Sequence, residues 1–157
     1  MGCYIGCSAL AVGRFLPPGG RLITAELDPK TADIARQLIL YAGLDQVITV
    51  VTAKADQVAT VLRSKYSVDK LDLVFIDHEP KSHYVQDLKL LEELNLLRKG
   101  TVVMADNILF PGTPGFLEYV EGSGRYQTER FHSLSIGVDI PDIMTISFYS
   151  GNDTFTK

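Results

Sequence analysis

Strand-sized and helix-sized segments alternate along almost the whole chain, and this alternation limits the possible folds more than any other feature. Short β-branched or apolar runs occupy residues 21–26, 47–52, 71–76 and 101–105, and stretches of helical length separate them. Parallel strands need crossover connections of this kind, which are usually helices. The sequence therefore predicts an α/β fold with a mostly parallel sheet and helices on both of its faces.

The segments between and after these strands carry the signals of helix ends and of a final hairpin. Asp28 is the expected cap of the second helix, with Pro29 in its first turn and Gly43 just beyond its end. The other expected helices cover residues 8–16, 56–66, 84–94 and 115–121. The last two β-rich stretches, 126–131 and 143–149, are expected to pair as an antiparallel hairpin at the edge of the sheet.

Length and composition bound the organisation of the chain. Its 157 residues, 46% of them hydrophobic, suit one core, so we expect a single domain over residues 1–157. The net charge of −4 and the scattered basic residues exclude a nucleic-acid-binding surface. Apolar runs are strand-sized, well short of the roughly 18 residues of a membrane span. Cys3 and Cys7 lack disulfide partners and favour a cytoplasmic protein, while a longer, membrane-tethered form stays open.

Ligands of open α/β sheets collect beyond the carboxyl ends of the strands, and two such places here suit a nucleoside cofactor. The glycine-rich turn from Gly2 to Ser8 leads into a helix, whose free N–H groups can hold a carboxylate. Glu26 ends the next strand, 24 positions after Gly2, close to the spacing of an acidic residue that binds a ribose. The alternatives are a glycine-rich tail and a carboxylate that only caps the following helix.

The two central strands end in oxygen ligands of the kind that metal ions prefer. Asp77 follows one strand and Asp106-Asn107 follows the other, a set of hard donors that suits Mg²⁺ completed by water and substrate oxygens. Their alternative roles are a helix cap and a turn. Lys81 lies four residues after Asp77 and is a candidate general base, although most lysines are solvated surface residues.

Six blocks of the sequence, in their order and spacing, resemble the catechol O-methyltransferase family over nearly the whole chain. The blocks are Gly2-x-Tyr4-x-Gly6-x-Ser8-Ala9, Ala25-Glu26-Leu27-Asp28, Tyr41-Ala42-Gly43-Leu44, Leu71 to His78, Leu96 to Val102, and Ala105-Asp106-Asn107 followed by Pro111-Gly112-Thr113-Pro114.

The resemblance implies a Rossmann-like class I methyltransferase sheet and S-adenosylmethionine as the methyl donor. Gly2, Tyr4 and Ser8 would surround the methionine end of this cofactor, and Glu26 would bind its ribose. The remaining positions that the resemblance assigns to the cofactor are Leu27, Asp56, Asp77 and His78, with Leu27 and His78 beside the adenine.

The resemblance also implies a reaction. Asp77, Asp106 and Asn107 would hold Mg²⁺, and Lys81 would take the proton from a catechol hydroxyl as it attacks the methyl group. Asn107 and Pro111 would contact the catechol substrate. The expected function is Mg²⁺-dependent O-methylation of a catechol of the catecholamine type.

The chain departs from the family pattern in three places. The family has helices and a first strand before the glycine turn; because that strand lies in the middle of the sheet, its absence predicts two neighbouring strands with unpaired edges. Glu79-Pro80 makes the segment before Lys81 one residue longer and replaces an aromatic of the catechol pocket. The family's late acidic residue has no clear counterpart, with Asp139 and Asp142 as candidates.

Two other functions compete with the methyltransferase. A non-catalytic relative that binds a protein partner is favoured by the missing N-terminal elements and the altered pocket. A nicotinamide-dependent oxidoreductase on a similar sheet is disfavoured, because it would leave Asp77 and Asp106-Asn107 without a shared purpose.

Overall fold

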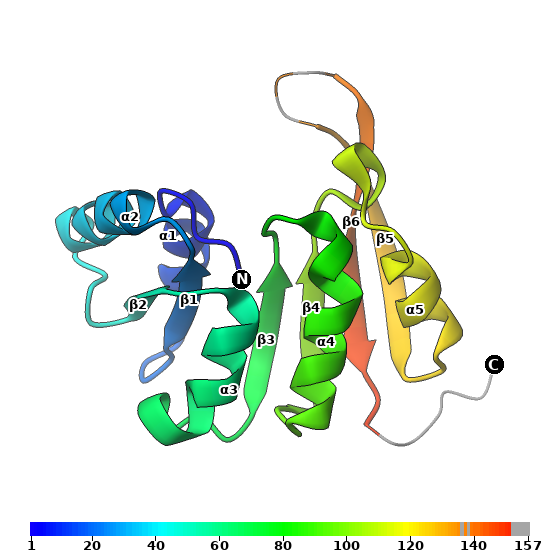
Figure 1. The fold of residues 1–157 in the computed structure, drawn as a ribbon, viewed down its shortest axis with the longest axis horizontal. Helices are drawn as coiled ribbons and strands as arrows, with labels where there is room; N and C mark the ends of the chain where they lie inside the picture. Colours follow the sequence, from blue (N-terminus) through cyan, green and yellow to red (C-terminus); the bar gives the residue numbers. More distant parts are fainter. Residues whose placement is uncertain (136, 138, 152–157) are drawn as a thin grey trace. The chain divides into compact units, whose positions relative to one another are not determined.

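The computed structural model describes residues 1–135, 137 and 139–151. The chain divides into two compact units, one of residues 1–60 and one that begins at Val61 (Figure 1). The expected single domain over residues 1–157 stays a prediction.

The first unit holds a two-stranded parallel sheet. Its elements are α1 (Cys7–Gly13), β1 (Leu22–Glu26), α2 (Pro29–Tyr41), β2 (Ile48–Thr52) and the start of α3 (Ala55–Tyr66). Leu22 pairs with Ile48 and Glu26 with Thr52, so both strands end at the same edge. The core of this unit is formed by Cys3, Ala9, Ala35, Ile39 and Ile48.

Helix α2 begins and ends where the sequence predicts. The carboxylate of Asp28 accepts hydrogen bonds from the Thr31 backbone N–H (2.8 Å) and hydroxyl (2.6 Å), which makes Asp28 its N-cap. Ala32, Ala35 and Ile39 are buried at spacings of three and four residues, as in a helix with one face toward a core. The helix therefore packs this face inward.

The second unit is built on a four-stranded sheet with the order β3-β4-β6-β5. Its elements are β3 (Leu71–Ile76), η1 (Lys81–His83), α4 (Tyr84–Glu93), β4 (Leu97–Ala105), η2 (Ile108–Gly112), α5 (Phe116–Gly122), β5 (Tyr126–Leu134) and β6 (Pro141–Tyr149). Strands β3 and β4 are parallel, whereas β6 is antiparallel to both β4 and β5. Figure 1 shows β5 and β6 as a long hairpin.

These strands confirm the α/β class, the parallel pairs and the antiparallel edge hairpin. Among the described residues, β1 pairs only with β2, and β3 pairs only with β4. The first strand expected between β1 and β3 stays a prediction. Strand β3 is less buried than a continuous apolar run suggests: Val74 and Ile76 are fully buried, but Leu73 and Phe75, which face the other way, are only partly so.

The beginning of β4 is irregular, and the strand starts four residues earlier than expected. Leu71 pairs with Leu97, but the next pair is Leu73 with Val102, so extra residues of β4 loop out between them. The buried Thr101 hydroxyl closes this bulge, because it donates to the Leu71 carbonyl (2.6 Å) and accepts from the Arg98 N–H (2.9 Å). Past the bulge, β3 and β4 run in register to their carboxyl ends.

A buried polar cluster connects α4, α5 and β5. The carboxylate of Glu92 accepts hydrogen bonds from the Tyr119 hydroxyl (2.8 Å), the Arg125 guanidinium (2.7 Å) and the Tyr126 hydroxyl. Burial, reinforced by the negative charge of Glu92, raises the pKa of Tyr119 to about 12. These hydrogen bonds connect α4 and α5 to the β5–β6 hairpin at the edge of the sheet.

Candidate active site

In the first unit, the glycine turn and the end of β1 are held together by Glu26. Its Oε2 accepts a hydrogen bond from the Tyr4 backbone N–H (2.7 Å), and its Oε1 accepts one from the Asp28 N–H (3.0 Å). Three residues of this turn have backbone φ angles in the left-handed region: +89° at Gly2, +48° at Tyr4 and +95° at Gly6. A carboxylate oxygen can accept more than one hydrogen bond, so Glu26 keeps capacity for ribose hydroxyls.

The other predicted cofactor residues of this unit lie on its surface. Ser8 is exposed in the first turn of α1, and Leu27 is 61% exposed just after β1. Asp56 is exposed in the first turn of α3, where its Oδ1 accepts a hydrogen bond from the Gln57 N–H (2.8 Å). Their side chains are accessible to a ligand, and their assignment to the cofactor stays a prediction.

In the second unit, the register of β3 and β4 places the predicted metal ligands side by side. Ile76 pairs with Ala105, so Asp77 and Asp106 follow a matched pair of strand ends. The Asp106 N–H also donates to the Ile76 carbonyl (3.2 Å), and Asp106 Oδ1 accepts from the Asn107 N–H (2.8 Å). The ends of two parallel strands thus present three oxygen-bearing side chains at one edge, as the sequence predicts.

Lys81 connects these side chains from the short turn η1. Its Nζ donates to Asp77 Oδ1 (2.9 Å), to Asn107 Oδ1 (2.8 Å) and to the Tyr84 hydroxyl (3.1 Å), and the side chain is 9% exposed. Tyr84 is fully buried, and burial together with the negative charges of Asp77 and Asp106 raises its pKa, so it stays a neutral phenol. Although the segment before Lys81 is one residue longer than in the family pattern, the Lys81 amine still lies beside Asp77 and Asn107.

The donor set suits a divalent cation. Burial, with a further contribution from the negative charges of Asp77 and Asp142, raises the pKa of Asp106. Two carboxylates and an amide oxygen are hard ligands of the type that Mg²⁺ takes, with water and substrate for the rest. The described residues contain no cluster of three or more His, Cys, Asp or Glu suited to a metal, and the set here relies on Asn107 as its third member.

His78 packs inside the second unit. Its Nε2 lies 2.7 Å from Asp87 Oδ2, and both side chains are 10% exposed. Its ring meets Tyr84 edge to face at 5.2 Å between centroids. The imidazole therefore contacts α4, and its expected place beside the adenine stays a prediction.

The loop after Asn107 exposes three apolar residues in sequence. Leu109 is 52% and Phe110 36% exposed, and Pro111 is also exposed, whereas Ile108 is buried beneath them. Exposed apolar side chains next to polar ligands are a typical surface for an aromatic substrate. The role of Pro111 as a substrate contact stays a prediction, and Leu109 and Phe110 join it as candidates that the sequence alone did not single out.

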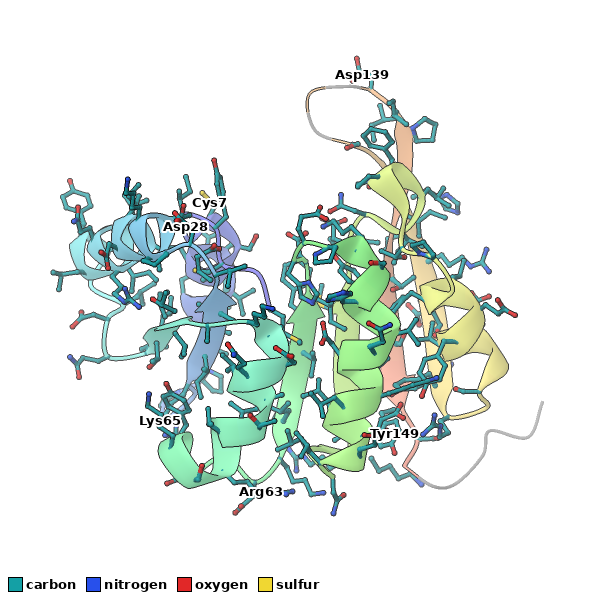
Figure 2. All side chains as sticks on the ribbon, in the orientation of Figure 1. Cys7, Asp28, Arg63, Lys65, Asp139 and Tyr149 are labelled. Atoms are coloured by element: carbon teal, nitrogen blue, oxygen red, sulfur yellow. The ribbon has the colours of Figure 1, made fainter. Side chains whose placement is uncertain are left out.

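The two acidic candidates late in the chain have different surroundings. Asp139 is exposed, and Figure 2 shows it at the outer tip of the β5–β6 hairpin. Asp142 is 2% exposed, and its carboxylate accepts hydrogen bonds from Leu109, Phe110, Ile143 and Asn107. Burial alone would raise the pKa of Asp142, but these hydrogen bonds outweigh it and the pKa is lowered. Asp142 is thus built into the site as an ionised carboxylate.

Comparison with known proteins identifies the family. The O-methyltransferase family model matches residues 1–128, which include the glycine turn, Glu26 and the Asp77–Asn107 set. The chain belongs to the O-methyltransferase family. It is 46% identical to catechol O-methyltransferase of Bos taurus over 133 residues (85% of this chain, 48% of that protein) and 43% identical to the human transmembrane O-methyltransferase over 134 residues (85% and 46%).

A solved O-methyltransferase also shares the fold. The crystal structure of the O-methyltransferase from Bacillus cereus, determined in complex with SAH, matches this chain with a TM-score of 0.80 at 26% sequence identity. The match covers 95% of this chain and 71% of the Bacillus cereus chain. The chain spans about half the length of the two curated relatives above. Among the described residues, no helix is long and apolar enough to cross a membrane.

Proposed function

We propose that this chain carries the catalytic residues of a Mg²⁺-dependent methyltransferase that moves a methyl group from S-adenosylmethionine to one hydroxyl of a catechol. The observation that carries the proposal is the placement of Lys81 Nζ within 2.9 Å of Asp77 Oδ1 and 2.8 Å of Asn107 Oδ1. A candidate base thereby lies among candidate metal ligands. Relatives named catechol O-methyltransferase support the choice of substrate class.

Each residue of the site has a distinct task in this reaction. Asp77, Asp106 and Asn107 would hold the ion, which when bound supplies a Lewis acid for the two catechol oxygens. Lys81 would accept the proton of the attacking hydroxyl once its own amine is neutral, and its contacts with Tyr84 and Asp77 described above would keep the Lys81 nitrogen in place. S-adenosylmethionine, when bound, would supply the methyl group: the catechol oxygen would bond to the methyl carbon as the carbon–sulfur bond breaks, and the bonding electrons would remain on sulfur.

The cofactor residues supply orientation more than chemistry. Glu26 would accept hydrogen bonds from the ribose hydroxyls and, through the Tyr4 N–H, fix the turn that surrounds the methionine end. Methyl transfer in line needs the oxygen, carbon and sulfur to be aligned, so fixed positions account for much of the rate enhancement.

The test is a methyl-transfer assay with the purified chain, radiolabelled S-adenosylmethionine and 1,2-dihydroxybenzene, with Mg²⁺ or with EDTA. We expect labelled product only with Mg²⁺, and far less with 1,3-dihydroxybenzene, whose oxygens are too far apart to share one ion. Asp106→Ala should abolish transfer, whereas Asp69→Ala, an exposed aspartate, should leave it unchanged. Undiminished transfer in EDTA or in Asp106→Ala would contradict the proposal.

A protein-binding, non-catalytic role stays the alternative. A folded chain that binds no S-adenosylmethionine in calorimetry would favour it over the enzyme. A longer, membrane-tethered form is a further proposal, supported by relatives that are named transmembrane O-methyltransferase.

A further inference from the structure

The side chain of Asn107 lies between two charged partners of opposite sign. Its Oδ1 accepts a hydrogen bond from Lys81 Nζ (2.8 Å), and its Nδ2 donates one to Asp142 Oδ2 (3.2 Å). An ammonium group can only donate and a carboxylate can only accept, so a single orientation of the amide satisfies both. The chemistry of the partners therefore determines which side of the amide faces Lys81.

Asp142 is itself held rigidly by the backbone. Its Oδ1 accepts hydrogen bonds from the N–H groups of Ile143 (2.7 Å), Leu109 (3.0 Å) and Phe110 (3.2 Å). These donors occupy one oxygen of a carboxylate that is almost fully buried and leave Oδ2 for the amide of Asn107. Hydrogen bonds to an ionised acceptor are stronger than those between neutral groups, so this arrangement is well fixed.

Asn107 has an unusual backbone conformation, and the loop after it is bound by the same carboxylate. Its dihedral angles, φ +60° and ψ +42°, lie in the left-handed region, which Asn and Asp tolerate better than most residues. The loop that follows is tied to Asp142 by the Leu109 and Phe110 N–H groups. One carboxylate of β6 thus fixes both the amide of Asn107 and the loop after it.

We infer that Asp142 is a positioning residue whose Oδ2 holds the Asn107 amide so that its oxygen, and not its NH₂ group, is presented on the side of Asp77 and Lys81. This inference rests on the proposed function, because that oxygen is the one that would bind Mg²⁺. An outer partner that orients a ligand in this way commonly changes metal affinity by about 10- to 100-fold when it is removed.

An exchange of the two side chains tests the inference. In Asp142→Asn, the new amide oxygen can still accept from the three backbone N–H groups, but its NH₂ group then opposes the NH₂ group of Asn107. In Asn107→Asp, two carboxylates oppose each other. The double variant Asn107→Asp/Asp142→Asn restores one donor and one acceptor with their positions exchanged, and both residue types suit the left-handed backbone. Asp139→Asn, at the exposed hairpin tip, is the matched control.

Two measurements are needed on the wild-type chain and these variants. In calorimetric titrations with Mg²⁺, we expect Asp142→Asn to bind about tenfold or more weakly, and Asp139→Asn to bind as the wild type does. In thermal unfolding with EDTA, we expect a lower Tm for each single exchange and recovery of most of that loss in the double variant. If Asp142→Asn does not fold, renewed folding of the double variant supports the inference in its place.

The outcomes separate the inference from the function on which it rests. Wild-type Mg²⁺ affinity in a folded Asp142→Asn, or no recovery in the double variant, would overturn the positioning role. A wild-type chain that does not bind Mg²⁺ would instead overturn the proposed function, and the metal-free unfolding series would still decide whether Asp142 and Asn107 act as a donor–acceptor pair.

Discussion

The backbone N–H of Tyr4 donates a 2.7 Å hydrogen bond to Glu26 Oε2, across 22 positions of sequence. The same carboxylate holds the Asp28 N–H, so it links the glycine turn, the end of β1 and the start of α2. A residue proposed to bind the ribose is therefore also the one that shapes the turn around the rest of the cofactor.

The variant Glu26→Ala should bind the cofactor more weakly and should also be less stable. We expect S-adenosylmethionine affinity to fall about tenfold or more, and unfolding free energy to fall by about 1 kcal/mol because two partly exposed hydrogen bonds are lost. Calorimetry and urea unfolding measure the two effects. Glu129→Ala, an exposed carboxylate on β5, is the control, and a Glu26→Ala chain with unchanged cofactor affinity would count against the ribose role.

The variant Lys81→Met should separate chemistry from binding. It keeps an unbranched side chain of similar length in a buried position but cannot accept a proton, so we expect kcat to fall about 100-fold or more. Cofactor binding, measured by calorimetry, should change little. Lys65→Met, at the exposed end of α3 (Figure 2), should retain full activity, and comparable kcat values for both variants would argue against a general base at Lys81.

The variant Glu92→Gln should destabilise the chain without a direct effect on the reaction. The carboxylate accepts from Tyr119, Arg125 and Tyr126, and its loss leaves the Arg125 guanidinium without its counter-charge in a partly buried place. We expect the free energy of unfolding to fall by about 3 kcal/mol in urea titrations. Glu93→Gln, the exposed neighbour on the same helix, should change it by less than about 0.5 kcal/mol.

The raised pKa of Tyr119 predicts a loss of stability in alkali. Its pKa is about 12 in the folded chain and 10.0 for an unperturbed tyrosine, so the folded state holds the proton more tightly. The resulting stabilisation is complete below pH 10 and is lost as pH rises toward 12. Urea unfolding at several pH values should show a smaller decline across this window in Tyr119→Phe than in the wild type. Parallel declines would show that Tyr119 does not contribute.

Much of the fold could be predicted because its signals are local. Asp28 with Pro29 marks the start of α2, and the short apolar runs mark the strands, since capping and side-chain periodicity act within a few residues. The bulge at the start of β4 could not be predicted, because it depends on Thr101 reaching the Leu71 carbonyl 30 residues away. The position of Asp77 and Asp106 at one edge was predictable from the rule that parallel strands end at the same edge, while their role as metal ligands stays a proposal.

The role of Asp142 could not be predicted in the same way. Sequence reasoning kept Asp139 and Asp142 as equal candidates for a substrate contact, since both are acidic residues in one irregular stretch. The partners of Asp142 lie 32 to 35 residues earlier or are its own neighbour Ile143, and three of its four hydrogen bonds come from backbone N–H groups. Because every residue except proline has a backbone N–H, such donors cannot be recognised from the side chains in the sequence.

The antiparallel direction of β6 has a consequence for biosynthesis. Because β6 runs against β4, its first residues meet the carboxyl end of β4, and Asp142 reaches Asn107 from there. The ribosome makes the chain from its N-terminus, at about 5–20 residues per second, so Asp77, Lys81 and Asn107 are all synthesised before the carboxylate that orients Asn107. A nascent chain that stops short of residue 142 has every candidate metal ligand and still lacks the carboxylate that accepts a hydrogen bond from the Asn107 amide.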